Sequence, residues 1–200
     1  MSAEAEQIVD LYQRHVRAYD RLRGRSLFEK SWLDAFVALL PENASVLDIG
    51  CGMAEPIARY LCERGCRVTG VDSSPGMIDL CRERLPEHVW TVADMRALSL
   101  GRPFDGLLVW DSFFHLSPDD QRRMFPVFRR HAGLRSTLMF TSGPSHGVAI
   151  GSFEGEPLYH ASLNAGEYRT LLSDNGFAVV SHIAEDKNCN GHTVWLARRV

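Results

Sequence analysis

Residues 45–56 have the sequence SVLDIGCGMAEP, and this stretch organises the chain. Val46, Leu47 and Ile49 have the apolar character of a buried strand, and two glycines one residue apart follow at once. Glycine lacks a Cβ atom, so its backbone can adopt a positive φ and a ligand can approach it closely. Pro56 then stands where a helix would begin, and a helix N-terminus offers free N–H groups to an anion. The stretch therefore predicts a strand, a tight turn and a helix that bind a nucleotide-like ligand.

The residues of this turn argue against two common nucleotide-binding motifs. A dinucleotide-binding turn has the pattern Gly-x-Gly-x-x-Gly or Ala, but the last position counted from Gly50 is Glu55, whose carboxylate would face a pyrophosphate. The sequence also lacks the Gly-x-x-x-x-Gly-Lys-Ser/Thr pattern of a triphosphate-binding loop. A nicotinamide-dependent oxidoreductase is therefore disfavoured.

The same turn resembles the first motif of the class I S-adenosylmethionine (SAM)-dependent methyltransferases, in which alternating glycines follow an acidic residue. Here Ala54 stands in place of the third glycine of the family. The resemblance extends from about residue 27 to the end of the chain. It implies SAM as the cofactor and S-adenosylhomocysteine (SAH) as the product. It also implies cofactor contacts from four residues of the turn: Asp48, Gly50, Cys51 and Gly52.

The length and composition predict a single domain, residues 1–200, with a sizeable core, since 45% of the residues are hydrophobic. A net charge of −3 gives no electrostatic footprint of nucleic-acid or anionic-membrane binding. No apolar run approaches a membrane span, and the acidic N-terminus does not resemble a signal peptide. Five cysteines without paired C-x-x-C spacing indicate reduced thiols in a cytoplasmic protein. We expect this protein to be a monomer or a homodimer. Cys62 and Cys66 leave metal binding as an alternative, although we expect no metal.

The second predicted strand, residues 66–72, ends in an acidic residue that follows the glycine turn at a characteristic distance. Asp72 lies 20 positions after Gly52, where a carboxylate can accept both hydroxyls of an adenosine ribose. The resemblance implies further cofactor contacts from Ser73 and from Met77, which packs on the adenine. A methionine of the ordinary core is the alternative for Met77.

The third and fourth predicted strands also lead into candidate cofactor residues. Residues 88–92 are followed by Asp94 and Met95, which in the resembled family contact the adenine; Asp94 as a turn or helix-cap residue is the alternative. Residues 104–110 form a continuous apolar run, typical of a parallel strand covered on both faces. Its last residue, Trp110, is a further expected cofactor contact.

Strand and helix patterns alternate four times in succession, which predicts an α/β fold with a doubly wound sheet. Acidic residues fall at or near the carboxyl ends of the four strands, where such sheets bind ligands: Asp48, Asp72, Asp94 and Asp111. Residues 177–183 and 193–197 flank an Asn-Gly turn and predict a terminal antiparallel hairpin. With the resemblance, the expected fold is a Rossmann-like, seven-stranded, mostly parallel sheet with helices on both faces.

Residues 110–116 lie where the resembled family places the methionine end of SAM and the acceptor. Methyl transfer is an in-line displacement, so positioning supplies much of the acceleration. A hydroxyl or ammonium acceptor also needs a base, and His115 and Asp111 are the nearest suitable groups. The alternative is that His115 simply flanks a helix. Trp110 and Phe114 form either core or an aromatic wall beside the cofactor and acceptor.

The N-terminal residues 3–22 predict a helix with two tyrosines and several arginines. Ser26 and Glu29 then predict a capping box at the start of a second helix. In the resembled family, such an N-terminal segment often closes over the cofactor and substrate. Residues 1–25 are therefore a possible lid, with a plain packing helix as the alternative, and the candidate substrate contacts are Tyr12, Tyr19 and Arg25.

A glycine-rich stretch, residues 142–163, follows the fifth predicted strand and is too long for a minimal connection. Because it leaves the carboxyl end of a strand, we expect a long loop over the acceptor pocket. An ordinary surface loop is the alternative. The expected substrate contacts are His146, Tyr159 and His160.

These observations together predict a methyltransferase that acts on a small molecule. The sequence has no appended recognition domain, and a loop and a lid can enclose a metabolite. The absence of an Asn/Asp-Pro-Pro-Tyr/Phe tetrapeptide counts against methylation of a nucleobase amine or a glutamine amide. Two alternatives remain at this point, a protein or RNA methyltransferase and a SAM-binding module without catalysis.

Overall fold

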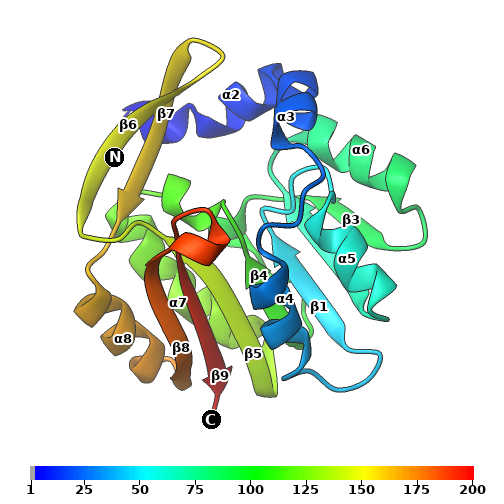
Figure 1. Cartoon of the computed structure of the whole chain (residues 1–200), viewed down its shortest axis with the longest axis vertical. Coiled ribbons are helices and arrows are strands. Elements are labelled where there is room, and N and C mark those ends of the chain that lie inside the picture. Colours follow the sequence, from blue (N-terminus) through cyan, green and yellow to red (C-terminus); the bar gives the residue numbers. More distant parts are fainter. Residues whose placement is uncertain (1–2) are drawn as a thin grey trace.

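The computed structural model describes residues 3–200 (Figure 1). Seven strands of this described part form one sheet in the order β3-β2-β1-β4-β5-β9-β8. All neighbouring pairs are parallel except that β9 runs antiparallel to both β5 and β8. The strands are β1 (Ser45–Ile49), β2 (Arg67–Asp72), β3 (Val89–Val92), β4 (Phe104–Val109), β5 (Ala132–Ser142), β8 (Phe177–Asp186) and β9 (His192–Arg199). The expected fold class is confirmed, including the C-terminal antiparallel hairpin.

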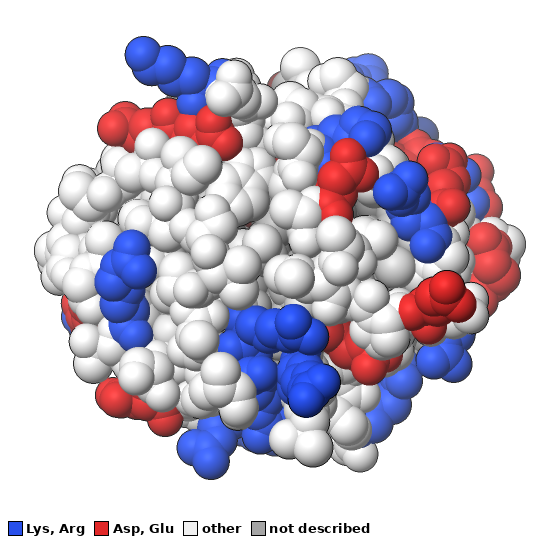
Figure 2. Space-filling model, turned by 60° about the horizontal axis from the view of Figure 1, so that its bottom comes forward, with Lys and Arg blue, Asp and Glu red and all other residues white. Residues whose placement is uncertain are grey.

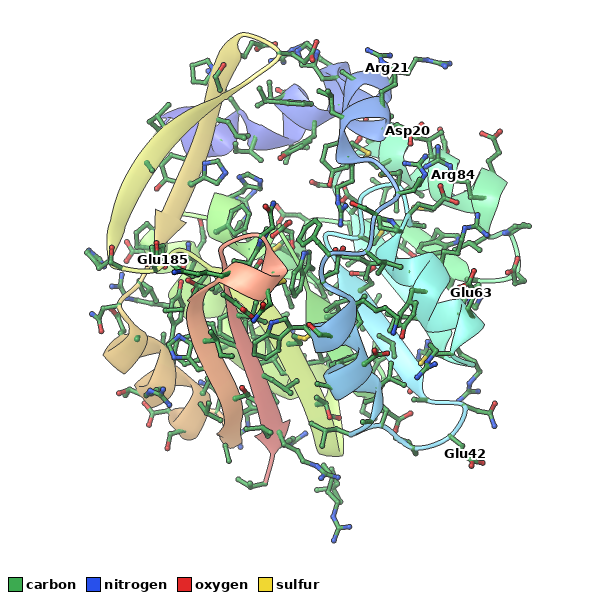
Figure 3. All side chains as sticks on the ribbon, in the orientation of Figure 1. Asp20, Arg21, Glu42, Glu63, Arg84 and Glu185 are labelled. Carbon is green, nitrogen blue, oxygen red and sulfur yellow. The ribbon has the colours of Figure 1, made fainter. Side chains whose placement is uncertain are left out.

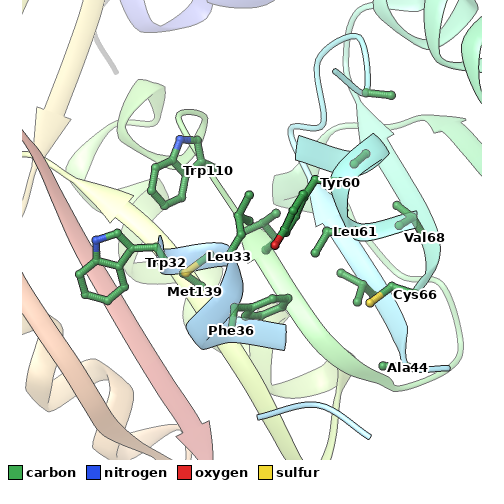
Figure 4. Close-up of a cluster of buried hydrophobic side chains, with 14 of the residues drawn as sticks. Trp32, Leu33, Phe36, Ala44, Tyr60, Leu61, Cys66, Val68, Trp110 and Met139 are labelled. Atoms are coloured by element: carbon green, nitrogen blue, oxygen red, sulfur yellow. The ribbon is translucent and has the colours of Figure 1, made fainter. Parts of the chain in front are cut away.

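Helices cover both faces of the sheet because side chains of a strand alternate between its faces. In β1, Val46 packs into a core cluster with α4, α5 and α6, whereas Leu47 and Ile49 pack into a second cluster with α7 and α8. Figure 4 shows the first cluster, in which Leu33 and Phe36 of α4 lie against the sheet. The helices are α4 (Lys30–Val37), α5 (Ile57–Glu63), α6 (Pro75–Arg84), α7 (Pro118–His131) and α8 (Ala165–Asp174).

The turn between β1 and α5 has the left-handed backbone that its glycines predict. Gly50 has φ +75° and Gly52 has φ +52°. A Cβ atom on Gly50 would lie 2.2 Å from Cβ of Ser112, so the turn packs against the segment after β4 without room for a side chain. Ala54, at the third glycine position of the resembled motif, also has a positive φ of +69°. The Gly50 backbone N–H donates to the carbonyl of Val71 at 2.8 Å, which fixes the turn to β2.

The N-terminal segment, residues 3–23, is divided into three short helices, so the expectation of one continuous helix was wrong. They are α1 (Ala3–Glu6), α2 (Ile8–Arg14) and α3 (Val16–Arg23). His15 interrupts the helix with φ −110° and ψ 23°, and its Nε2 lies 2.6 Å from Oε1 of Glu156. This long-range contact was invisible to a local reading of the sequence.

The N-terminal segment crosses above the carboxyl ends of the strands and reaches α6 (Figure 1). Gln13 Oε1 accepts hydrogen bonds from Ser74 Oγ at 2.6 Å and from the Gly76 backbone N–H at 3.0 Å. Asp20 accepts a hydrogen bond from Arg84 Nη2 at 2.7 Å, and these two labelled side chains lie together in Figure 3. Side-chain contacts therefore hold the segment in place.

The predicted capping box at Ser26 and Glu29 does not form. Glu29 is itself the residue before α4, and it makes no side-chain capping bond. Its carboxylate is fully buried and instead forms an ion pair with Arg23. A buried carboxylate needs a partner of opposite charge more strongly than a helix end needs a cap, which explains the difference.

The glycine-rich stretch forms a second, two-stranded sheet and is not the expected long loop. β6 (Gly147–Phe153) pairs antiparallel with β7 (Glu156–Ser162). Glu154 and Gly155 form the two-residue turn with φ +51° and +82°, the left-handed conformation that suits a tight hairpin. Most of β6 is exposed to solvent. A strand with no buried face does not need alternating apolar residues, so the sequence pattern did not indicate a strand here.

The surface carries charges of both signs. Figure 2 shows groups of basic and acidic side chains, among them a larger basic group near the lower edge of the view, on the face that includes the bottom of Figure 1. Among the helices of residues 3–200, none combines the length and apolar character that a membrane span requires.

Candidate active site

A cavity of about 110 Å³, here called the central cavity, lies between the carboxyl ends of the strands and the N-terminal segment. The sheet side contributes residues from the ends of β1, β2, β3 and β4, and the N-terminal side contributes two tyrosines. The cavity therefore unites residues that are far apart in the sequence. Its lining includes Tyr12, Tyr19, Gly50, Gly52, Asp72, Met77, Asp94, Met95, Asp111, Ser112 and His115.

Asp72 is at the end of β2 and faces the glycine turn. Its carboxylate accepts hydrogen bonds from the backbone N–H groups of Gly52 at 3.0 Å and Ser74 at 2.9 Å. Burial raises the pKa of Asp72 to about 6, although these N–H groups and that of Ser73 act in the opposite direction. The carboxylate is thus oriented by backbone donors while it lines the cavity.

Met77, Asp94 and Met95 line the same cavity as Asp72. Asp94 precedes the short helix η1 (Met95–Ala97) and accepts a hydrogen bond from the Arg96 backbone N–H at 2.9 Å. Burial raises the pKa of Asp94, but the Arg96 guanidinium outweighs it and holds that pKa below its usual range. Asp94 is therefore both a helix cap, one of the roles left open by the sequence, and a lining residue.

A smaller cavity of about 30 Å³, here called the glycine-turn cavity, adjoins the central cavity and shares Gly50, Gly52, Tyr19 and Asp111 with it. Its lining also includes three residues expected from the sequence and one from α3: Asp48, Cys51, Trp110 and Arg23. Burial, together with the nearby Asp72 carboxylate, raises the pKa of Asp48 to about 7.

His115 closes the short helix η2 (Phe113–His115) and is buried. Its Nδ1 lies 2.8 Å from the carbonyl oxygen of Tyr159, which can only accept, so Nδ1 carries the proton. Nε2 then accepts a hydrogen bond from the Tyr12 hydroxyl at 3.1 Å. Burial lowers the pKa of His115 to about 4, so the ring is neutral at physiological pH.

Asp111, the other predicted catalytic residue, forms an ion pair with His192 and not with His115. Its carboxylate lies 3.1 Å from His192 Nε2, while His192 Nδ1 donates to the carbonyl of Cys189 at 2.9 Å. Burial lowers the pKa of His192, but Asp111 outweighs it and raises the pKa above its usual range. An acceptor at each ring nitrogen favours the doubly protonated, cationic form of His192.

The third cavity, here called the hairpin cavity, has a volume of about 550 Å³ and lies between β6, β7 and the ends of β5 and β9. It holds three of the expected acceptor contacts, Phe114, His146 and His160, together with His192. The rings of Phe114 and His160 lie 5.2 Å apart. Among the described residues that line it, none is Asp, Glu, Lys or Arg.

Two predicted substrate contacts line none of these three cavities. Arg25 instead forms ion pairs with Asp20 at 2.8 Å and Glu55 at 2.7 Å. The side chain of Tyr159 is buried against Ile8, and only its backbone carbonyl acts on the site, through His115. Neither residue is therefore among those that line the three cavities.

The sequence reading missed Ser112 and His192. Ser112 lines the central cavity and donates a hydrogen bond to the Ile49 carbonyl at 2.8 Å, which joins the ends of β1 and β4. His192 begins β9 directly after the Asn190-Gly191 turn. A final strand antiparallel to β5 brings its first residue to the carboxyl edge of the sheet, so the predicted topology contained the signal for His192.

Residues 46–133 match a family model described as a methyltransferase domain. The chain is 33% identical over 94 residues to dTDP-4-amino-2,3,4,6-tetradeoxy-D-glucose N,N-dimethyltransferase of Saccharopolyspora spinosa, covering 46% of this chain and 37% of that protein. It is also 33% identical over 114 residues to magnesium-protoporphyrin O-methyltransferase of Rhodobacter capsulatus, covering 52% of this chain and 49% of that protein. The chain therefore spans less than half the length of these relatives.

Solved structures share the fold over nearly the whole chain. SAM-bound CalS10, an amino pentose methyltransferase from Micromonospora echinaspora, has a TM-score of 0.72 at 19% identity and covers 92% of this chain and 96% of its own. The Burkholderia thailandensis 1,6-didemethyltoxoflavin-N1-methyltransferase has a TM-score of 0.74 at 21% identity, covering 100% of this chain and 92% of its own. Residues 46–133 are thus similar to a methyltransferase domain, and the chain has the Rossmann-like methyltransferase fold.

Proposed function

We propose that this chain transfers a methyl group from SAM to a small-molecule acceptor and releases SAH. The observation that carries the proposal is the Asp72 carboxylate, which accepts a hydrogen bond from the glycine turn and lines a cavity with Met77 and Asp94. A carboxylate at the end of the second strand can accept the hydroxyls of a ribose, and the glycines of the adjacent turn let a nucleoside approach the backbone closely. Bound SAM supplies an electrophilic methyl group on a sulfonium, whose sulfur keeps the electron pair when the methyl carbon bonds to the acceptor.

The residues of the site suit this cofactor, provided that the N-terminal segment moves. The central cavity, at about 110 Å³, is smaller than the roughly 300–1,000 Å³ typical of ligand pockets. Tyr12 and Tyr19 occupy its N-terminal side. We therefore keep residues 1–25 as a proposed lid, of which residues 1 and 2 lie outside the described part.

The hairpin cavity is the proposed acceptor site. Its volume of about 550 Å³ suits a metabolite, and Asp111 and His192 connect it to the cofactor side. Phe114 and His160 supply ring faces, and His146 also lines the cavity. Among the described residues that line it, none is Lys or Arg, so the lining offers no basic surface for RNA.

His115 is the proposed proton acceptor for an acceptor hydroxyl or amine. Its ring centroid lies 4.9 Å from that of His160, which lines the hairpin cavity, and its Nε2 accepts a hydrogen bond from the Tyr12 hydroxyl on the side of the central cavity. Because burial lowers its pKa to about 4, His115 remains able to accept a proton down to about pH 5. Asp111 is proposed to act beside it, paired with His192.

The proposal is tested by incubating methyl-labelled SAM with the protein and a heat-treated cell extract, followed by separation by size. We expect label in the low-mass fraction with the wild type, and a large loss with Asp72→Ala. His115→Gln is expected to slow transfer more than it weakens SAM binding. Label on protein or RNA would support the alternative acceptors, and SAM binding without any transfer would support a non-catalytic module.

A cytoplasmic location with no nucleic-acid or membrane partner also remains a proposal. Its support is chemical, since the five cysteines are free thiols, as expected of a reducing compartment.

A further inference from the structure

The side chains that line the hairpin cavity leave a charged ligand without a partner. Among the described lining residues, none is Asp, Glu, Lys or Arg. The cationic form of His192 is already balanced by Asp111, whose carboxylate lies 3.1 Å from its Nε2. Burial lowers the pKa of His160, so this ring is neutral at physiological pH. An ion that leaves water without finding a counter-ion loses free energy of solvation, so the lining favours an uncharged ligand.

Ring faces and uncharged polar groups make up much of this lining. The rings of Phe114 and His160 lie 5.2 Å apart and are tilted by 40°, and Ala161 adds apolar surface. The side chains of Ser145 and Asn190 also line the cavity, and neither has a hydrogen-bond partner within residues 3–200. A lining of this kind suits a planar ring that carries a hydroxyl group.

The classes of acceptor atom differ in the charge that they bring to the cavity. An aliphatic amine is a cation at neutral pH, and its methylated product is again a cation. A carboxylate is an anion before the methyl group arrives. A hydroxyl is uncharged at the start, and its methyl ether is uncharged once the proton has left. Of these three classes, the hydroxyl alone suits the lining both before and after transfer.

His115 limits the acidity that the acceptor hydroxyl must have. Its ring centroid lies 4.8 Å from that of Phe114 and 4.9 Å from that of His160, and both of these rings line the hairpin cavity. Burial lowers the pKa of His115 to about 4, so His115 is a weak base. A phenol, with a pKa of about 10, gives a proton to a weak base more readily than a much less acidic aliphatic alcohol does. The base and the cavity together favour an aromatic hydroxyl.

We propose that the acceptor is an uncharged phenol bound in the hairpin cavity, an inference that rests on the proposed function. The phenol oxygen forms a bond to the methyl carbon of SAM while the carbon–sulfur bond breaks, and the sulfur keeps that electron pair. The phenol proton goes to Nε2 of His115, in place of the hydrogen bond that Tyr12 donates there. The products are an uncharged aryl methyl ether, SAH and protonated His115.

The first test determines the class of acceptor from the product formed in a cell extract. Methyl-labelled SAM is incubated with the protein and a heat-treated extract, and the low-mass label is passed over anion and cation exchangers at neutral pH. We expect the labelled product to bind neither exchanger and to survive mild alkali. Hot hydriodic acid is expected to release the label as methyl iodide, as it does from an aryl methyl ether.

Three results of this test would overturn the proposal. They are retention of the label on either exchanger, its release as methanol by alkali, which indicates a methyl ester, and a label that hydriodic acid does not release. Failure of the proposed function gives a different result, because no enzyme-dependent label would then form at all.

The second test compares three naphthalene probes that share one ring system and differ in charge. They are 2-naphthol, naphthalene-2-carboxylate and naphthalen-2-ylmethylamine, titrated by calorimetry into the protein saturated with SAH. We expect the uncharged naphthol to bind about tenfold or more tightly than the anion and the cation. Equal or tighter binding of a charged probe, or no binding of the naphthol, would overturn the proposal. A wild type that does not bind SAH would instead contradict the proposed function.

A variant of the cavity wall tests whether the ring faces hold the phenol. Phe114→Leu is expected to weaken 2-naphthol binding about three- to tenfold and to leave the SAH affinity unchanged. Val180→Ala, at an exposed position on β8, is the matched control and should change neither affinity. Unchanged naphthol binding by Phe114→Leu, or an equal loss of SAH binding, would show that this ring does not form an acceptor wall.

Discussion

The two sides of the central cavity are built by different kinds of contact. On the sheet side, backbone hydrogen bonds and close packing fix Gly50, Gly52 and Asp72, as in the 2.8 Å bond from Gly50 N–H to Val71. On the N-terminal side, Tyr12 and Tyr19 are on short helices that side-chain contacts attach to α6 and to the hairpin. The sheet side is therefore part of the fold, whereas we propose that the N-terminal side can detach while the fold remains.

The largest expected effect comes from adding one methyl group on the sheet side. Gly50→Ala places Cβ 2.2 Å from Cβ of Ser112 at φ +75°, and we expect the free energy of unfolding to fall by about 3–5 kcal/mol. Gly52→Ala meets only the Tyr19 ring at 3.5 Å, so we expect a loss of about 1 kcal/mol. Urea unfolding of both variants measures the difference. The added methyl group meets the sheet side at Gly50 and the Tyr19 ring of the N-terminal side at Gly52, so similar losses of stability would contradict the distinction between the two sides.

The second effect is a pH dependence on the sheet side. Asp48 has a folded pKa of about 7, above its ordinary value of 3.8, so the folded state binds the additional proton and loses stability as pH rises from about 4 to 7. Asp48→Asn removes this loss. We expect the variant to gain on the order of 2–4 kcal/mol relative to the wild type between pH 4.5 and 8.

This comparison isolates Asp48 from His115, whose lowered pKa has the opposite effect. The folded pKa of His115 is about 4, below its ordinary 6.5, so stability is lost as pH falls through that range. His115 is present in both proteins and cancels in the difference. Asp79→Asn, at an exposed position, is the control, and a pH-independent difference for Asp48→Asn would refute the burial of its charge.

A smaller effect is expected on the N-terminal side. Tyr12→Phe removes the donor to His115 Nε2, and an unpaired buried acceptor costs about 1–2 kcal/mol. We expect faster amide hydrogen exchange over residues 3–23, with little change in the sheet. Tyr19→Phe is the matched control, because its hydroxyl has no hydrogen-bond partner among residues 3–200. Equal acceleration in the sheet would mean that the segment does not open separately.

The smallest effect concerns the ion pairs that join α3 to α6. Hydrogen bonds from Arg84 and Arg25 lower the pKa of Asp20, so its contribution is present above about pH 4 and is lost as pH falls. Asp20→Asn is expected to weaken attachment of the segment by about 0.5 kcal/mol, less so in high salt. Asp10→Asn, exposed on α2, is the control. A salt-independent change in hydrogen exchange would argue against an ionic contact.

The sequence predicted the sheet side well because its residues follow the strands directly. Once β1, β2 and β3 are placed in parallel, Gly50, Asp72 and Asp94 must meet at one edge, and all three line the central cavity. The spacing of 20 residues between Gly52 and Asp72 corresponds to a hydrogen bond of 3.0 Å. Local pattern and parallel topology are sufficient for such contacts.

The structures of the N-terminal side and of the β6–β7 hairpin could not be predicted in the same way, because they depend on contacts between residues far apart in the sequence. His15 and Glu156 are 141 positions apart, and their contact accompanies the break between α2 and α3. His192 meets Asp111 across 81 positions. The ion pairs of Arg25 with Asp20 and Glu55 likewise could not be predicted from a local pattern.

Calorimetric titration with SAH measures whether the glycine turn and Asp72 bind a nucleoside with an amino-acid end. We expect one saturable site in the wild type and, for Asp72→Ala, an affinity about 10- to 100-fold weaker because the ribose hydroxyls lose their acceptor. Asp79→Ala, on the exposed face of α6, should bind like the wild type. No binding by the wild type, or equal binding by the two variants, would contradict the account.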